Sequence, residues 1–179
     1  MGNLRSVAKA LEAAGASVHL SSDTAEIAAC DGMCVPGQGI FGRCMDNVGR
    51  AGLDDFIRSW ISEERPYLGI CLGMQILFAS SEERGPRAGL GIFGGRVTKL
   101  TGDVPVPHIG WNLVADDYFY FDHSYAVHAD DEDIVDGWCD HGERFAARIR
   151  AGSVLAVQFH PEKSSTRGIA LMADWLAQR

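Results

Sequence analysis

Residues 67–75 read Tyr-Leu-Gly-Ile-Cys-Leu-Gly-Met-Gln, and their pattern indicates the fold class. The residues before the cysteine are apolar or small, which is typical of a buried strand, and this strand leads directly into Cys71. After the cysteine, Met74, Leu77 and Phe78 recur at helical spacing. The sequence therefore predicts a strand, a sharp turn at Cys71 and a helix, which together are one unit of a parallel sheet covered by helices.

The segments before this unit also alternate between helix and strand patterns. Apolar residues at helical spacing predict helices over residues 4–11 and 53–61, and short apolar runs predict strands over residues 16–20 and 32–35. A parallel α/β domain normally begins with a strand, whereas this chain leads almost at once into a helix. The first strand of the sheet is therefore apparently absent.

From Gly91 onward the sequence becomes mainly β-like. Strands are predicted over residues 92–100, 118–121, 124–127, 145–149 and 154–159, and a last helix carries Ile169, Met172, Ala173 and Leu176 on one face. We expect a single α/β domain spanning residues 1–179. Its central sheet is expected to be mostly parallel and flanked by helices, with extra β-rich pieces in the C-terminal half.

Composition narrows the classes of function. A formal net charge of -8 with no basic run makes a nucleic acid or an anionic membrane an unsuitable partner. The chain has neither an apolar stretch of roughly 18 residues nor a secretory signal, so a cytoplasmic location is expected. The five cysteines form no C-x-x-C pair, and Cys30, Cys34 and Cys44 match no common zinc spacing. Reduced thiols are expected, without a metal or another cofactor.

Gly69-Ile70-Cys71-Leu72-Gly73 has the G-x-nucleophile-x-G form, in which glycines remove side chains that would clash at a sharp turn. At the start of a helix, unpaired backbone N–H groups and the helix dipole favour the reactive thiolate of Cys71. The backbone N–H of Leu72 would also face a developing oxyanion. A buried structural cysteine explains this pentapeptide about equally well when it is taken alone.

His160-Pro161-Glu162 offers a base for this nucleophile, because it follows the apolar strand predicted over residues 154–159. Glu162 would fix the tautomer of His160 and stabilise its imidazolium form, as in other triads of nucleophile, base and orienting group. A histidine at the end of a strand is, however, more often a surface or capping residue.

Two more segments can complete a pocket. Pro36-Gly37-Gln38-Gly39 can bring backbone N–H groups close to a substrate, although a plain turn explains it as well. His123-Ser124-Tyr125 offers hydroxyl and backbone polar groups, although core packing of Tyr125 is the alternative.

Gly69 to Gln75 together with His160-Pro161-Glu162 resembles the class I glutamine amidotransferases, whose triad is cysteine, histidine and glutamate in that chain order. Within that class, four further segments resemble the glutaminase subunits of imidazole glycerol phosphate synthases: residues 36–41, 107–112, 120–125 and 159–164. The resemblance runs from Met1 to the C-terminal helix.

This resemblance implies hydrolysis of glutamine and passage of the ammonia to a barrel-shaped cyclase subunit, the partner in a heterodimer. The cyclase joins the ammonia to a phosphoribulosyl nucleotide, which yields imidazole glycerol phosphate and an aminoimidazole carboxamide nucleotide in histidine biosynthesis. Carried over by position, Cys71 attacks the amide, His160 protonates the departing ammonia and Glu162 orients His160.

The resemblance also assigns roles around the triad. The backbone of Gly37, Gln38 and Leu72 would form the oxyanion hole, Gln75, Ser124 and Tyr125 would hold the substrate, and Asn3, Trp111, Asn112 and Lys163 would lie toward the cyclase.

The chain departs from the family's pattern in three places. The family usually has a strand before Gly2-Asn3, a valine where Gln38 stands, and an apolar residue where Asp122 stands. Two alternatives stay open: a glutaminase subunit of an anthranilate or aminodeoxychorismate synthase, and a catalytically silent binding subunit.

Overall fold

The computed structural model describes residues 4–177. Its helices are α1 (Leu4–Ala13), α2 (Thr24–Ala28), α3 (Phe41–Arg50), α4 (Leu53–Ser62), α5 (Leu72–Gln75) and α6 (Ser165–Ala177), with 3-10 turns at Glu132–Ile134 and Pro161–Lys163. Its strands are β1 (Met33–Gly37), β2 (Tyr67–Cys71), β3 (Phe78–Ser81), β4 (Arg87–Ala88), β5 (Phe93–Lys99), β6 (His108–Val114), β7 (Asp117–His123), β8 (Tyr125–Ala129), β9 (Val135–His141), β10 (Glu143–Ala151) and β11 (Val154–Val157).

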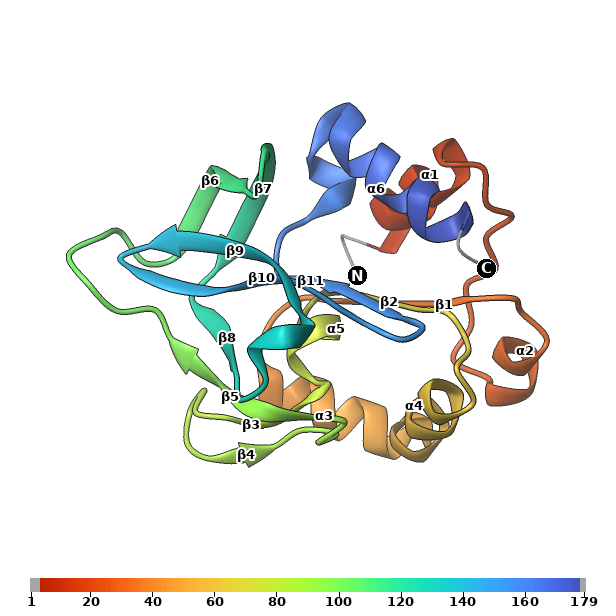
Figure 1. Cartoon of the computed structure of the whole chain (residues 1–179). Helices are drawn as coiled ribbons and strands as arrows, with labels where there is room; N and C mark the ends of the chain where they lie inside the picture. Colours follow the sequence, from red (N-terminus) through yellow and green to blue (C-terminus); the bar gives the residue numbers. More distant parts are fainter. Residues whose placement is uncertain (1–3, 178–179) are drawn as a thin grey trace.

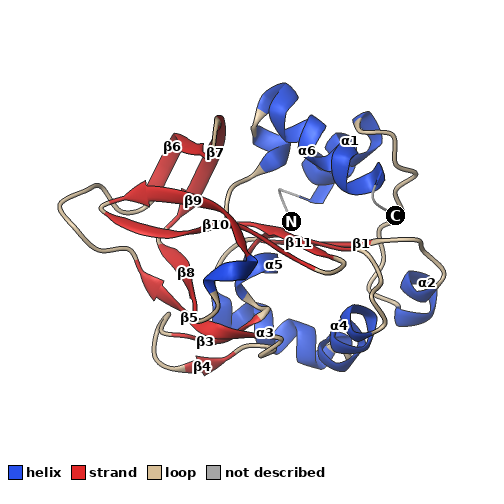
Figure 2. Ribbon diagram, viewed as in Figure 1, coloured by secondary structure: helices blue, strands red, loops and turns tan. Residues whose placement is uncertain are grey.

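A curled sheet of nine strands runs through the molecule in the order β1-β2-β11-β10-β8-β5-β3-β4, with β9 added on β10. Strands β6 and β7 form a separate two-stranded ribbon (Figure 1). Helices α1 and α6 lie together on one side of the sheet, and α3 and α4 lie on the other (Figure 2). This arrangement of helices around a central sheet confirms the predicted fold class.

Parallel pairing is limited to β1-β2-β11 and to β3-β5, so the parallel part is smaller than the alternation of helices and strands indicates. The β-rich C-terminal half pairs antiparallel, as in β9-β10 and β10-β11. The physical reason is the length of the connections, because parallel neighbours need a crossover of a dozen or more residues whereas antiparallel neighbours need only a tight turn.

Strand β2 is buried along its whole length because both faces of the sheet are covered. Leu68 and Ile70 pack into the hydrophobic cluster that includes residues of α1 and α6. Tyr67 packs into the cluster that includes residues of α3 and α4. Since side chains alternate along a strand, this short apolar segment contributes to both cores at once. The predicted buried strand before Cys71 is confirmed.

The predicted strand over residues 16–20 is wrong, because these residues form no strand. A strand needs a neighbouring strand to pair with its backbone, and β1 lies at the end of the sheet order with β2 as its neighbour. A groove of about 910 Å³ follows β1 and is lined by residues 32–40 and 19–22, among others.

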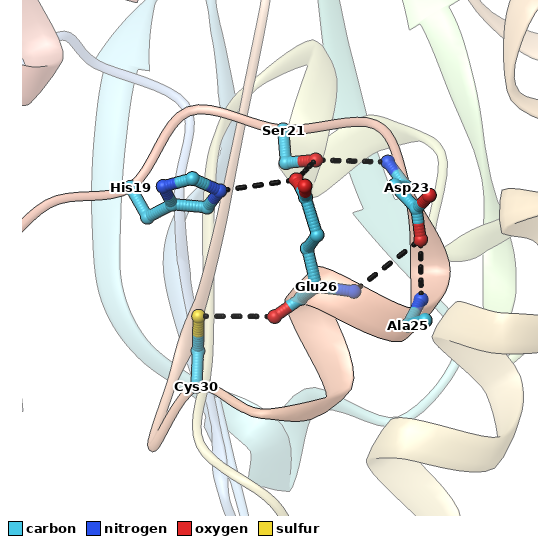
Figure 3. Close-up of polar contacts among 6 residues, drawn as sticks. All are labelled: His19, Ser21, Asp23, Ala25, Glu26 and Cys30. Carbon is cyan, nitrogen blue, oxygen red and sulfur yellow. Dashed lines mark hydrogen bonds and ion pairs between the residues drawn. The ribbon is translucent and has the colours of Figure 1, made fainter.

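Side-chain hydrogen bonds order the chain between α1 and α2 in place of a sheet (Figure 3). His19 and Ser21 converge on the carboxylate of Glu26, and the His19 Nε2 to Glu26 Oε2 distance is 3.1 Å. Hydrogen bonds from Ser21 and then from His19 lower the pKa of Glu26. The carboxylate of Asp23 accepts the backbone N–H of Ala25 at 2.8 Å and so caps α2.

Among residues 4–177, none of the helices has the length and the apolar character that crossing a bilayer requires.

Candidate active site

Three neighbouring parallel strands bring the predicted site segments together. Gly37 at the end of β1 is in register with Cys71 at the end of β2, and Val157 of β11 is in register with Ile70. The carboxyl ends of parallel strands meet at one edge of a sheet, where open α/β folds bind ligands. Segments that are far apart in the sequence, residues 37–39, 71–75 and 158–160, therefore surround one point.

Cys71 stands on the predicted sharp turn between β2 and α5, with φ 54° and ψ -107°. A positive φ is costly for a residue with a side chain and persists only where the surroundings enforce it. The surroundings do so here, since a Cβ on Gly73 would lie 1.7 Å from the carbonyl oxygen of Val35, and one on Gly69 would lie 2.6 Å from that of Gly73. Only glycines allow this close packing, as the G-x-C-x-G pattern indicates.

His160 and Glu162 form a buried pair directly after β11. The Nδ1 of His160 donates to Oε1 of Glu162 at 2.8 Å, and the two side chains are 2% and 0% exposed. Backbone bonds fix the segment, because the His160 N–H donates to the carbonyl of Tyr120 and the Ser164 hydroxyl donates to the carbonyl of His160. With Nδ1 held by Glu162, the Nε2 atom is left for the hydrogen bond between His160 and Cys71.

The surroundings of His160 favour its charged form. Burial lowers the pKa of His160, but hydrogen bonds with Cys71 and Glu162 and the negative charges of both groups outweigh burial and raise the pKa to about 9. The ring is therefore an imidazolium at neutral pH. It stands ready to donate a proton to a group that leaves from a carbon attacked by the sulfur of Cys71.

A pocket of about 430 Å³ opens at this point, and it has the size of a site for a small molecule. It is lined by Gln38, Gly39, Cys71, Leu72, Gln75, Glu83, Pro107, Asp122, His123, Ser124, Tyr125 and His160. All three residues predicted to hold the substrate are in this set. Gly37 and Glu162 lie behind the lining: a Cβ on Gly37 would meet the Cβ of Leu72 at 2.4 Å, and Glu162 stands behind His160.

The residues predicted to face a partner do not lie inside the pocket. Trp111 is 53% exposed on β6, whereas Asn112 next to it donates inward to the backbone carbonyl of Asp140. Lys163 pairs with Asp122 at 3.3 Å, and its Nζ lies 5.5 Å from the ring centre of Tyr120. Asn3 lies outside the described residues.

The sequence analysis missed Gln158, which is fully buried and donates from Nε2 to the sulfur of Cys71 at 3.5 Å. A signal was present, since Gln158 is an amide inside the apolar run 154–159. A buried amide needs hydrogen-bond partners, and such a residue next to a proposed base is a candidate for the site. Glu83 was also missed because it belongs to none of the motifs.

Burial makes three of the other thiols less acidic. Burial raises the pKa of Cys44 to about 11 and that of Cys139 to about 12, and it raises the pKa of Cys34 further. Thiols with raised pKa values are poor nucleophiles at neutral pH. Within residues 4–177, no group of three or more His, Cys, Asp or Glu side chains is placed to hold a metal ion.

Comparison with known proteins places this geometry in a family. The sequence profile of the family "Glutamine amidotransferase class-I" matches residues 1–178. A relative from Symbiobacterium thermophilum, "Imidazole glycerol phosphate synthase subunit HisH", is 43% identical over 98% of this chain and 89% of its own length. The protein of that name from Bacillus subtilis is 39% identical over 98% of this chain and 91% of its own.

Solved structures agree on the fold. A crystal structure of a glutamine amidotransferase superposes with a TM-score of 0.73 at 19% identity, covering 97% of this chain and 95% of that chain. The glutaminase domain of Trypanosoma brucei CTPS with bound acivicin gives 0.66 at 18% identity, covering 99% and 89%. The chain therefore belongs to the class I glutamine amidotransferases and, within them, to the family of imidazole glycerol phosphate synthase subunit HisH.

Proposed function

We propose that the chain hydrolyses glutamine to glutamate and ammonia at Cys71, and that it passes the ammonia to a cyclase subunit in the cytoplasm. The observation that carries this proposal is the alignment of a thiol, an imidazole and a carboxylate along one side of a small pocket. The relatives named as subunits of imidazole glycerol phosphate synthase support the partner and the pathway, which is histidine biosynthesis.

The geometry supports a thioester mechanism. The thiolate of Cys71 attacks the carboxamide carbon of glutamine, and His160 donates its Nε2 proton to the nitrogen, so that the C–N bond breaks and ammonia leaves. Water then attacks the thioester and gives its proton to His160, which releases glutamate and the thiolate. The backbone N–H groups of Gly37, Gln38 and Leu72 are proposed to stabilise the oxyanion, because these residues adjoin the sulfur.

The pocket lining is suited to an amino-acid substrate. The side-chain amide of Gln75 and the segment Ser124-Tyr125 lie on its wall and offer polar groups to the bound substrate. The carboxylates of Glu83 and Asp122 also line the pocket and are suited to the α-ammonium group of glutamine.

The β6-β7 ribbon supports docking of a partner. Ile109, Trp111, Leu113 and Tyr118 on this ribbon are between 43% and 60% exposed, which is unusual for large apolar side chains. In β6 they occupy alternate positions and so share one face of the strand. Together with Lys163, this face is proposed to meet the cyclase, whereas Asn112 alternates with it along β6 and donates inward.

Ammonia release from glutamine, measured with the purified chain alone and then with a cyclase subunit and its nucleotide substrate, tests the proposal. We expect release to rise at least about tenfold with the pair, since partner ligands commonly complete such sites by a population shift. Equal release in all conditions would contradict coupling to a cyclase. Binding to an anthranilate synthase component in place of the cyclase would contradict the pathway.

The pH dependence of this reaction is expected to follow His160. Its imidazolium is the proton donor, so kcat/KM for glutamine should hold up to a pH of about 9 and then fall about tenfold per pH unit. Replacing Glu162 with glutamine removes one of the groups that raise the pKa of His160, so the fall should begin at lower pH in that variant. Rates measured between pH 6 and 10.5 check both statements, and a profile that is flat to pH 10.5 would rule out this donor.

The same pKa has a consequence for stability. His160 has a folded-state pKa above its ordinary 6.5, so its ion pair stabilises the fold fully below pH 6.5, and the contribution is lost as the pH rises through about 9.

A further inference from the structure

A buried amide lies directly behind the nucleophile. Gln158 is 0% exposed, donates from Nε2 to the sulfur of Cys71 at 3.5 Å, and accepts at Oε1 from Nε2 of Gln75 at 2.9 Å. The two ends of a glutamine amide have nearly the same shape, so the neighbours decide which end faces the sulfur. An N–H donor would stabilise a thiolate, whereas a carbonyl oxygen in the same place would repel it.

The orientation of Gln158 is set by Gln75. The Nε2 of Gln75 also donates to the backbone carbonyl of Tyr125 at 2.9 Å. A carbonyl oxygen can only accept, so the nitrogen of Gln75 must be the end that reaches both Tyr125 and Gln158. Gln158 therefore presents its oxygen to Gln75 and its N–H to Cys71.

His123 also bonds the carbonyl of Tyr125, and His108 bonds His123. Nδ1 of His123 lies 3.0 Å from this oxygen, and Nε2 of His123 lies 3.0 Å from Nδ1 of His108. The two histidines are register partners on β7 and β6. Since the carbonyl only accepts, Nδ1 of His123 carries a proton, and its Nε2 is free to accept from His108.

Asn112 closes the far end of this series. Its Nδ2 donates to the carbonyl of Asp140 at 3.0 Å and lies 3.2 Å from Nε2 of His108. Its Oδ1 accepts the N–H of Leu113 at 2.7 Å, which fixes the direction of the amide. His108 must then accept at Nε2 and donate at Nδ1 to His123. One arrangement of protons satisfies every bond, and both imidazoles are neutral in it.

The environment agrees with neutral rings. His108 and His123 are 4% and 6% exposed, and His108 stacks between Phe121 and His141 at centroid distances of 4.6 and 3.9 Å. Burial and then the charge on His141 lower the pKa of His108 to about 4. Burial also lowers the pKa of His123, to about 3, against the opposing effect of its bond to Tyr125.

We propose that Gln158 is a further catalytic residue, which stabilises the thiolate of Cys71 through its side-chain N–H. We name the series that orients it the amide–imidazole relay: Asn112, His108, His123, the Tyr125 carbonyl, Gln75 and Gln158. The relay residues other than Gln158 are positioning residues, because they act on the sulfur through it. This inference rests on the proposed function in one respect, which is that the thiolate of Cys71 is the nucleophile that attacks glutamine.

Alkylation of Cys71 by iodoacetamide tests the proposal without glutamine turnover. In Gln158→Met the shape is retained and the donor is lost, so the alkylation rate at pH 7 should fall about tenfold, the size of one charge-assisted hydrogen bond. Mass spectrometry of the peptide that contains Cys71 separates it from the other cysteines.

A pair of substitutions at His123 tests the relay itself. In His123→Asn, the amide nitrogen takes the place of Nδ1 and keeps the bond to Tyr125, whereas in His123→Gln the amide reaches the position of Nε2 and loses that bond. We expect His123→Gln to slow alkylation at pH 7 several-fold relative to His123→Asn. His19→Asn, on the loop before α2, is the matched control and should change nothing.

The outcomes separate clearly. Wild-type alkylation at pH 7 in a folded Gln158→Met would overturn the role of Gln158, and equal rates in the two His123 variants would overturn the relay. If Gln158→Met does not fold, as thermal unfolding would show, the His123 pair still decides. A chain that releases no ammonia but shows the expected alkylation rates would contradict the proposed function and support the relay.

The titratable groups around this sulfur include His160, after β11, and Cys44, on α3, and the pocket that Cys71 lines also carries Glu83, Asp122 and His123. Among these groups only His123 is substituted, and both His123 variants lack its imidazole, so the two are compared at equal charge.

Discussion

Cys71→Ser is expected to abolish glutamine-dependent ammonia release, with a loss of at least about 10³-fold. Serine keeps the size of the side chain and the strained turn, but its hydroxyl does not ionise beside His160 as a thiol does. The imidazolium would then have no anionic nucleophile to assist. The measurement is ammonia release from glutamine by the chain together with the proposed cyclase subunit, at the pH of maximal activity.

Two controls make this result specific. The same complex supplied with ammonium salt should turn over its nucleotide at the wild-type rate, since that reaction does not need the thiol. Cys30→Ser changes a cysteine that bonds the backbone of Glu26 and should leave ammonia release within twofold. Ammonia release by Cys71→Ser above one hundredth of the wild-type rate would refute Cys71 as the nucleophile.

The part of the site that could be predicted lies in short, contiguous motifs. Cys71 between glycines and His160 two residues before Glu162 carry their chemistry in residue type and spacing, and the parallel strands β2 and β11 place them together. Such motifs can be identified from the sequence because each one directly follows or ends a strand, and the strand fixes its position in the fold. The assignment of catalytic roles to these residues stays a prediction until variants are measured.

The part that could not be predicted depends on contacts between distant residues. Gln158 meets Gln75 and Cys71 only after β2 and β11 have paired, and His108 meets His123 only in the β6-β7 ribbon. Nothing in the sequence around any one of these residues specifies the partner. A hydrogen-bond relay of this kind is a property of the fold, because it depends on tertiary contacts and not on local sequence.

Two errors in the predicted elements have the same origin. Residues 16–20 have a strand-like pattern, but among the described residues no strand lies beside them to pair with their backbone. The pattern alone therefore did not produce a strand. The helical spacing after Cys71 continues to Phe78, yet α5 ends at Gln75 and Phe78 begins β3. Leu77 and Phe78 are fully buried, which fits a helix and a strand equally well. A short apolar run without a longer periodic pattern cannot distinguish the two.

Helix α3, over Phe41–Arg50, was not predicted, because glycine and polar residues interrupt its apolar pattern. Its two buried residues, Phe41 and Val48, are seven positions apart and so lie on one face of the helix. Tertiary packing against the sheet selects this face, which local propensity does not reveal.

Gly73→Ala is expected to destabilise the protein by about 3 kcal/mol or more. The added Cβ would lie 1.7 Å from the carbonyl oxygen of Val35, and because this contact is with backbone, no flexible side chain can move away to relieve it. Either α5 shifts away from β1 and the turn at Cys71 relaxes, or the sheet opens between β1 and β2. Both outcomes also remove Cys71 from its geometry, so ammonia release should fall together with the free energy of unfolding.

Gly49→Ala on α3 is the matched control, since a Cβ there meets nothing within 4 Å. Alanine favours a helix over glycine, so this variant should gain up to about 1 kcal/mol and keep full ammonia release. Urea unfolding followed by circular dichroism gives both midpoints. The two changes in unfolding free energy should have opposite signs, because the same glycine-to-alanine substitution places a Cβ against β1 at Gly73 and in open space at Gly49. A Gly73→Ala midpoint equal to that of the wild type would mean that the turn at Cys71 does not depend on close packing of α5 against β1.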